Sequence, residues 1–146
     1  MTKLGNYIMG SWVEGDGEGQ ILYHAVTGEP IVRATTEGLD FSGILQYART
    51  KGNPALRKMT FQERGRMLRA VALYLMQKKE QFYTVSYQTG ATRADSWIDI
   101  EGGFGNLFSN ASLRRKLPDT PFCLDGDPVP LSKQNSFMGH HILVPK

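Results

Sequence analysis

The chain has 146 residues, of which 40% are hydrophobic and 21% charged. This composition is that of an ordinary globular domain and excludes a disordered chain or a fibrous repeat. If compact, a chain of this length buries roughly two-thirds of its unfolded surface. The formal charge of +3 comes from scattered cations, with Arg114-Arg115-Lys116 as the one triple run. That run follows a predicted helix and suits the negative end of its dipole, so we expect no nucleic-acid partner.

Cysteine content and hydropathy favour a cytoplasmic protein that does not enter a membrane. Cys123 is the only cysteine, so no intramolecular disulfide can form. The N-terminus lacks the pattern of a secretory leader. The longest apolar runs, such as 70–76, are far shorter than the ~18 residues that a membrane span requires.

Two small β-hairpins are predicted in residues 1–37. Each pairs two short apolar runs across a turn: 7–8 with 12–13, and 21–23 with 31–34.

Helices are predicted for residues 38–117. The first extends from about Leu39 to Lys51, and Gly52-Asn53-Pro54 is expected to end it. Thr60-x-x-Glu63 is a capping-box pattern, so a second helix should begin there. Its apolar stripe has helical spacing and comprises Met67, Leu68, Val71, Ala72, Leu75 and Met76. A shorter helix through Phe82 should end at Gly90.

A further helix should begin at Thr92, which can cap it together with Asp95, and should end near Leu117-Pro118. Its apolar positions recur every three or four residues: Trp97, Ile100, Phe104, Leu107, Phe108 and Ala111. Three glycines, Gly102, Gly103 and Gly105, cost this helix roughly 2 to 3 kcal/mol relative to alanine. Close packing against another element is the expected reason, and room for a ligand is the alternative.

Residues 118–146 open with a turn-rich segment that contains four prolines and Cys123. A strand is predicted at 137–144, interrupted by Gly139. An apolar strand at this position suggests pairing with something outside the chain.

No catalytic, cofactor-binding or metal-binding constellation is predicted. Cys123 has apolar neighbours and no base beside it. The adjacent His140 and His141 would project to opposite faces of a strand, so convergent metal ligands are missing. Asp99 and Glu101 are two residues apart on a helix and do not face each other.

Several motifs nevertheless occur together in one order. These are the Trp12 hairpin, the turn Thr27-Gly28-Glu29, the helix start Thr60-x-x-Glu63-Arg64 and the corner Gln88-Thr89-Gly90. The set resembles the N-terminal segment of the aldehyde dehydrogenase superfamily over nearly the whole chain. Finer detail, above all residues 88–103, resembles the phenylacetic-acid-degradation branch. Members of that branch join a semialdehyde dehydrogenase to an enoyl-CoA-hydratase-like oxepin-CoA hydrolase domain.

The resemblance implies an α/β fold, α+β within this chain. Residues 38–117 would form the helical layer that precedes the nucleotide-binding sheet, which is missing here. Residues 118–146 would supply bridging strands, with homo-oligomer contacts through 129–144. Trp97, Ile100, Phe104 and Phe108 would flank the substrate tunnel.

For the parent protein the resemblance implies oxidation of a CoA-linked semialdehyde with NADP or NAD. The nucleophilic cysteine, the general-base glutamate and the cofactor site would all lie downstream, so we expect the segment alone to be inactive and to need the remainder of the parent chain. The alternative is a free-standing interaction module without catalysis, which docks through the glycine-bearing helix or the C-terminal strand.

Overall fold

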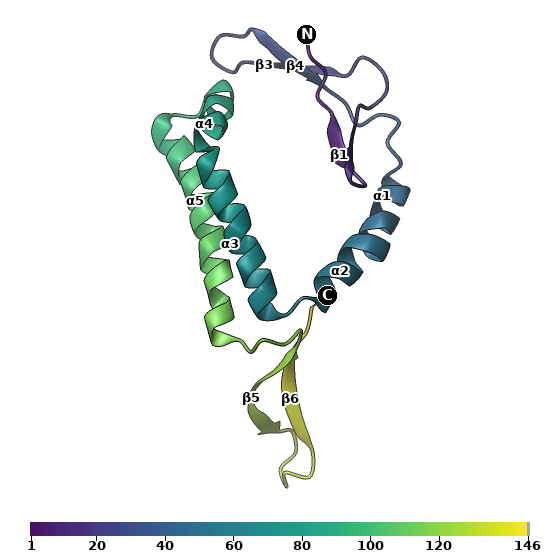
Figure 1. The fold of residues 1–146 in the computed structure, drawn as a ribbon, viewed down its shortest axis with the longest axis vertical. Helices are drawn as coiled ribbons and strands as arrows, with labels where there is room; N and C mark the ends of the chain where they lie inside the picture. The colour runs from purple at the N-terminus through teal and green to yellow at the C-terminus, as the bar shows by residue number, and fades with distance from the viewer. Residues whose placement is uncertain (146) are drawn as a thin grey trace.

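The structure is a computed structural model that describes residues 1–145. It combines helices with short strands, which confirms the expected mixture of α and β. The strands form three separate two-stranded antiparallel hairpins and not one sheet. Two hairpins lie at the top of Figure 1, the helices form two arms below them, and the third hairpin projects from the opposite end.

Both N-terminal hairpins are present as predicted. Strand β1 (Asn6–Ile8) pairs with β2 (Ser11–Val13), and β3 (Gln20–Tyr23) pairs with β4 (Pro30–Ala34). Met9 and Gly10 connect the first pair, and both have positive φ (49° and 88°). Positive φ at both central residues belongs to the two-residue turn whose twist matches that of the flanking strands.

The first helical arm is longer than predicted. Helix α1 (Phe41–Tyr47) is capped by the Asp40 carboxylate, which accepts from the amide of Gly43, and leads into the π-helical turn η1 (Ala48–Gly52) and then α2 (Asn53–Lys58). The predicted stop at Gly52-Asn53-Pro54 is therefore wrong. In the π turn the Asn53 amide bonds to the Ala48 carbonyl. Pro54 then falls in the first turn of α2, where its missing amide is tolerated.

The second arm contains α3 (Phe61–Gln77), α4 (Lys79–Gln88), α5 (Arg93–Ser112) and the short 3₁₀ helix η2 (Leu113–Lys116). The predicted capping box at the start of α3 is confirmed: the Glu63 amide donates to Thr60 Oγ1 at 3.1 Å and the Thr60 amide donates to Glu63 Oε2 at 2.8 Å. At the opposite end, Arg114 donates to the carbonyl of Ala111 at 2.7 Å, as expected for a cation at the end of α5.

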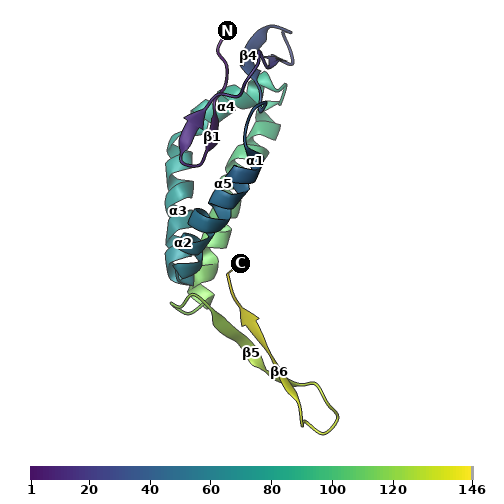
Figure 2. The same cartoon turned by 90° about the vertical axis from the view of Figure 1, so that its right-hand side faces the viewer.

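Helices α3 and α5 lie side by side in both ribbon views (Figures 1 and 2). Ala72 and Ala111 are buried in the contact, and Phe104 packs against Phe82 of α4 with ring centroids 6.2 Å apart. Of the predicted apolar stripe on α3, Ala72 is buried and Leu68 and Leu75 are half-buried. The other three members, Met67, Val71 and Met76, are exposed. Helix α3 therefore has an apolar side that α5 does not cover.

Strand β5 (Cys123–Pro130) pairs with β6 (Met138–Leu143) in the projecting hairpin. The turn-rich reading of the residues around Cys123 is wrong, because Cys123 begins β5. Pro128 and Pro130 are accommodated because a two-stranded ribbon has a free outer edge where no amide is required. The register shifts between Asp125 and Val129, where Gly126 has a φ of +73°.

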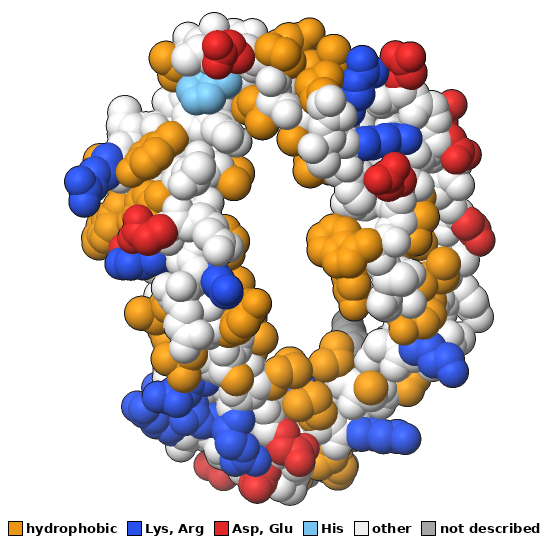
Figure 3. Space-filling view, turned by 45° about the horizontal axis from the view of Figure 1, so that its top comes forward, with side chains coloured by type: hydrophobic (Ala, Val, Ile, Leu, Met, Phe, Trp, Pro, Cys, Tyr) orange, Lys and Arg blue, Asp and Glu red, His pale blue; other side chains and the backbone are white. Residues whose placement is uncertain are grey.

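The chain is much more open than a compact protein. At 16.3 kDa a compact monomer exposes roughly 7,500 Å², whereas this chain exposes 10926 Å². The burial of two-thirds of the unfolded surface, which holds for a compact chain of this length, therefore does not apply to it. Figure 3 shows an opening through the middle of the molecule with hydrophobic side chains around it.

Candidate functional site

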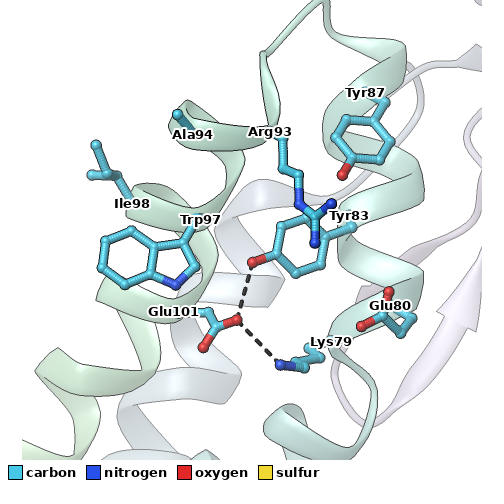
Figure 4. A pocket seen from close by; sticks show the side chains of 9 residues that line it. All are labelled: Lys79, Glu80, Tyr83, Tyr87, Arg93, Ala94, Trp97, Ile98 and Glu101. Atoms are coloured by element: carbon cyan, nitrogen blue, oxygen red, sulfur yellow. Dashed lines mark hydrogen bonds and ion pairs between the residues drawn. The ribbon is translucent and has the colours of Figure 1, made fainter.

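A cavity lies between α4 and α5 and is called here the α4–α5 pocket. Its volume is about 730 Å³. Figure 4 shows the nine residues that line it: Lys79, Glu80, Tyr83, Tyr87, Arg93, Ala94, Trp97, Ile98 and Glu101.

The corner between the two helices positions the pocket. Helix α4 ends before Gly90, whose φ of +86° is the left-handed conformation that was predicted for this glycine. Thr92 then caps α5, as predicted, and its hydroxyl accepts from the amide of Asp95 at 3.2 Å. Ser96, which is fully buried, bonds to Ser86 of α4 at 2.8 Å. These contacts hold the first turn of α5 against the last turn of α4.

A hydrogen-bonded network lies at one end of the pocket. Oε1 of Glu101 accepts from Lys79 Nζ at 3.2 Å and from the Tyr83 hydroxyl at 3.0 Å. The hydrogen bond from Lys79, followed by that from Tyr83, lowers the pKa of the Glu101 carboxyl. Burial, followed by the hydrogen bond to Glu101, raises the pKa of the Tyr83 phenol. Glu101 is therefore a stable carboxylate with Oε2 still available as an acceptor.

The pocket also carries a free cation. Among residues 1–145 the guanidinium of Arg93 makes no hydrogen bond or ion pair with the protein, and in Figure 4 its side chain extends from the start of α5 down to the level of Tyr83. Trp97 is 58% exposed. The pocket thus offers an unpaired cation, an accessible aromatic ring and a carboxylate.

A smaller apolar cavity of about 340 Å³ lies on the neighbouring side of α5. It contains Ile100 and Phe104 together with Leu75 and Phe82, and Asp99 borders it. Asp99 and Glu101 thus line different pockets, which confirms that they do not face each other.

The four predicted tunnel residues are not brought into one cavity. Trp97 lines the α4–α5 pocket, Ile100 and Phe104 line the apolar cavity, and the half-buried Phe108 borders neither. Phe104 is only 9% exposed and serves the core of this segment. Their placement beside a substrate tunnel stays a prediction.

The sequence reading passed over most of the α4–α5 pocket. Lys79, Tyr83 and Tyr87 recur every four residues on α4, and Arg93, Trp97 and Glu101 do so on α5. This spacing places each set on one helix face and was a usable signal. Apolar periodicity does not reveal it, because most of these six side chains are charged or phenolic.

The glycines of α5 do not serve close packing within this chain. A Cβ atom added at Gly102, Gly103 or Gly105 would meet no atom of another element within 4 Å. The expected close approach occurs instead at Gly65 of α3, where an added Cβ would lie 2.8 Å from the Ala111 carbonyl oxygen.

Among residues 1–145, no cluster of His, Cys, Asp and Glu has the geometry of a metal site. Within the same residues, no helix combines the length and hydropathy that crossing a bilayer requires. The half-buried Cys123 thiol remains free at the start of β5.

Comparison with known proteins supports a segment related to aldehyde dehydrogenases. The chain is 38% identical over 144 residues, 98% of its length, to a 3,4-dehydroadipyl-CoA semialdehyde dehydrogenase from Aromatoleum evansii. It spans 28% of the length of that relative. No family model matches the chain.

Proposed function

We propose that this chain is the segment of an aldehyde dehydrogenase that supports the catalytic and cofactor-binding parts of the enzyme. The enzyme would oxidise a CoA-linked semialdehyde with NAD or NADP, in the catabolism of phenylacetate. The observation that carries this proposal is the 38% identity, which extends over 98% of the chain. The relative is named for its dehydrogenase activity alone, so the hydrolase of the ring-opening branch stays a prediction from resemblance.

The open architecture supports a scaffold that other residues complete. The exposed surface exceeds that of a compact monomer by about 3,400 Å², and large side chains on both helical arms are exposed, among them Phe41, Leu45, Val71 and Tyr74. Exposed large apolar side chains that gather on a surface mark sites where other protein packs. The remainder of the parent chain is the proposed partner.

We propose in addition that residues 129–144 mediate contacts between protomers of the parent enzyme. The hairpin β5–β6 projects from the helices (Figure 2) and exposes Val129, Met138 and Ile142. The outer edge of β6 contains no proline and can therefore pair with another strand. In the parent enzyme, Ile142→Lys should lower the number of protomers per oligomer, as measured by analytical ultracentrifugation. An unchanged sedimentation coefficient of the enzyme would contradict this contact.

A chimera tests the proposed function. The matching segment of the Aromatoleum evansii dehydrogenase is replaced by this chain, and reduction of NAD and NADP is followed with a CoA-linked semialdehyde. We expect the chimera to be active and the isolated chain to be inactive. A chimera that folds and assembles like its parent but shows no turnover would count against the proposal.

The second candidate, a free-standing interaction module, makes the opposite prediction for the isolated chain. A self-sufficient module should be monodisperse and should unfold in one cooperative transition. That behaviour, together with failure of the chimera, would favour the module.

A further inference from the structure

One side of α3 carries an apolar surface that α5 leaves uncovered. Four side chains on successive turns form this surface, which is called here the α3 groove: Met67, Leu68, Val71 and Leu75. Their spacing of three and four residues places them on one face of the helix. Val71, in the middle, is 43% exposed. The groove therefore offers a continuous apolar face to another element.

A cavity lies at each end of the α3 groove. At one end, Leu75 lines the apolar cavity of about 340 Å³ that borders α5. At the other end, Met67 and Leu68 line a second cavity of about 340 Å³, which Leu56 of α2 also lines. Eight helical residues cover a little more than two turns. The groove is thus long enough to receive about two turns of another helix.

Gly103 of α5 leaves the cavity at Leu75 open. It lines that cavity, and a Cβ atom added to it would meet no atom of another element within 4 Å. Glycine inside a helix is destabilising relative to alanine, and no contact within residues 1–145 compensates for it. A glycine at such a position allows a neighbouring element to approach the backbone closely.

We propose that an amphipathic helix from the remainder of the parent chain docks in the α3 groove and places one large apolar side chain in the cavity beside Gly103. This docking rests on the proposed function, in which the chain is a segment of a larger enzyme. The chain spans 28% of the length of its relative, so most of such an enzyme is available to cover the groove. Apolar side chains at helical spacing are the usual occupants of a groove between helices.

The charge at the rim of the cavity adds a requirement on the docking helix. Asp99 borders the cavity beside Gly103, and its carboxylate forms no ion pair with any of residues 1–145. Covering a carboxylate without supplying a partner is costly, because the charge loses water. The docking helix should therefore carry a lysine or arginine close to Asp99 and apolar residues along the rest of the groove.

Two glycines of α5 supply a matched pair of substitutions in the full-length parent enzyme. Gly103 and Gly105 are both exposed, and an added Cβ meets no other element at either position. Leucine therefore brings the same gain in helix propensity to both. Two residues turn a helix by about 200°, so Gly105 faces away from the cavity that Gly103 lines.

Gly103→Leu should lower the melting temperature of the enzyme by about 3 °C or more, because the new side chain takes the space of the docked one. Gly105→Leu should leave the melting temperature unchanged or raise it. Gly103→Ala should act in the same direction as Gly103→Leu with a smaller shift, and it serves if the leucine variant does not fold. An empty cavity predicts the reverse, because leucine would fill it and stabilise the enzyme. A melting temperature that does not fall in either Gly103 variant, or that falls equally in Gly105→Leu, would overturn the docking.

Photo-crosslinking identifies what occupies the groove. A methionine analogue that carries a photoreactive diazirine is placed at Met67 in the parent enzyme, and the linked peptides are identified by mass spectrometry. We expect links to residues of the same protomer outside this segment. Links between protomers would assign the groove to a second copy and overturn the proposal. Links only within this segment, or none, would overturn it as well.

Oxidation of a CoA-linked semialdehyde by the unsubstituted enzyme is measured in parallel. Turnover without a difference between the Gly103 and Gly105 variants would retain the proposed function and refute the docked helix. No turnover together with the expected crosslinks would refute the proposed activity and retain the docked helix.

Discussion

Gly65 of α3 lies directly against the backbone carbonyl of Ala111 on α5. A Cβ atom at Gly65 would stand 2.8 Å from that oxygen and 2.7 Å from Cδ of Arg114. The side chain of Arg114 could move, but the carbonyl belongs to the last turn of a helix and could not. The absence of a side chain at this one position sets how closely the two longest helices approach.

Gly65→Ala should therefore destabilise the chain even though alanine favours a helix. The gain in helix propensity is about 1 kcal/mol, and we expect overpacking to exceed it, leaving a net loss of about 1 to 2 kcal/mol. Urea unfolding followed by circular dichroism measures the change. Gly102→Ala is the matched control, because an added Cβ there meets nothing within 4 Å. The control should stabilise by about 0.5 to 1 kcal/mol, and equal effects of the two substitutions would refute the argument.

Thr60→Ala should destabilise α3 by about 1 kcal/mol, because the amide of Glu63 loses its acceptor at the N-terminus of the helix. Thr60→Ser retains the hydroxyl and should be nearly neutral. The comparison of the two unfolding midpoints measures the cap. A Ser variant as unstable as the Ala variant would show that the methyl group matters more than the hydrogen bond.

The network around Glu101 predicts a dependence of stability on pH. The pKa of Glu101 is lowered in the folded chain by Lys79 and Tyr83. Its contribution is therefore complete above the pKa of the unfolded carboxyl and is lost as the pH falls through the lower pKa of the folded state. The Glu101→Gln variant should be less stable than the unsubstituted chain at pH 7. The two should become similar in stability at acidic pH. Thermal unfolding at several pH values measures the difference, and a constant gap would contradict the assignment.

Tyr83→Phe tests the same network from α4. Removal of the hydroxyl takes one donor from Glu101, so the pKa of that carboxyl should rise toward its usual value. Carboxyl chemical shifts followed by NMR across a pH titration report it. Tyr87→Phe is the control, since the Tyr87 hydroxyl makes no hydrogen bond to Glu101. A pKa that is equal in both variants would show that Lys79 alone holds the carboxylate.

The exposed apolar faces predict how the isolated chain behaves. With 10926 Å² of accessible surface, it should bind the dye ANS strongly. Fluorescence titration of the folded chain with the dye tests this. The absence of dye binding would indicate that the chain closes its own core.

Local structure was largely predictable. The capping box at Thr60, the N-cap at Thr92, the left-handed Gly90 and the two N-terminal hairpins depend on neighbours within about five residues, and each is present where it was expected. The helix through Gly52-Asn53-Pro54 and the strand that begins at Cys123 were missed. In both cases proline and glycine signals were read as breaks, but a π turn and a free strand edge accommodate them.

The sequence by itself determined where most helices and hairpins begin and end, and its motifs indicated the related enzymes, because capping, turn formation and periodicity act over a few residues. Tertiary structure alone decided which glycine serves close packing and which side chains meet in the α4–α5 pocket. Those outcomes depend on how α3, α4 and α5 lie against one another, and the apolar stripes leave several arrangements open. The Ala111 carbonyl beside Gly65 and the Glu101 carboxylate beside Tyr83 join residues 46 and 18 positions apart, and no local pattern encodes such a pairing.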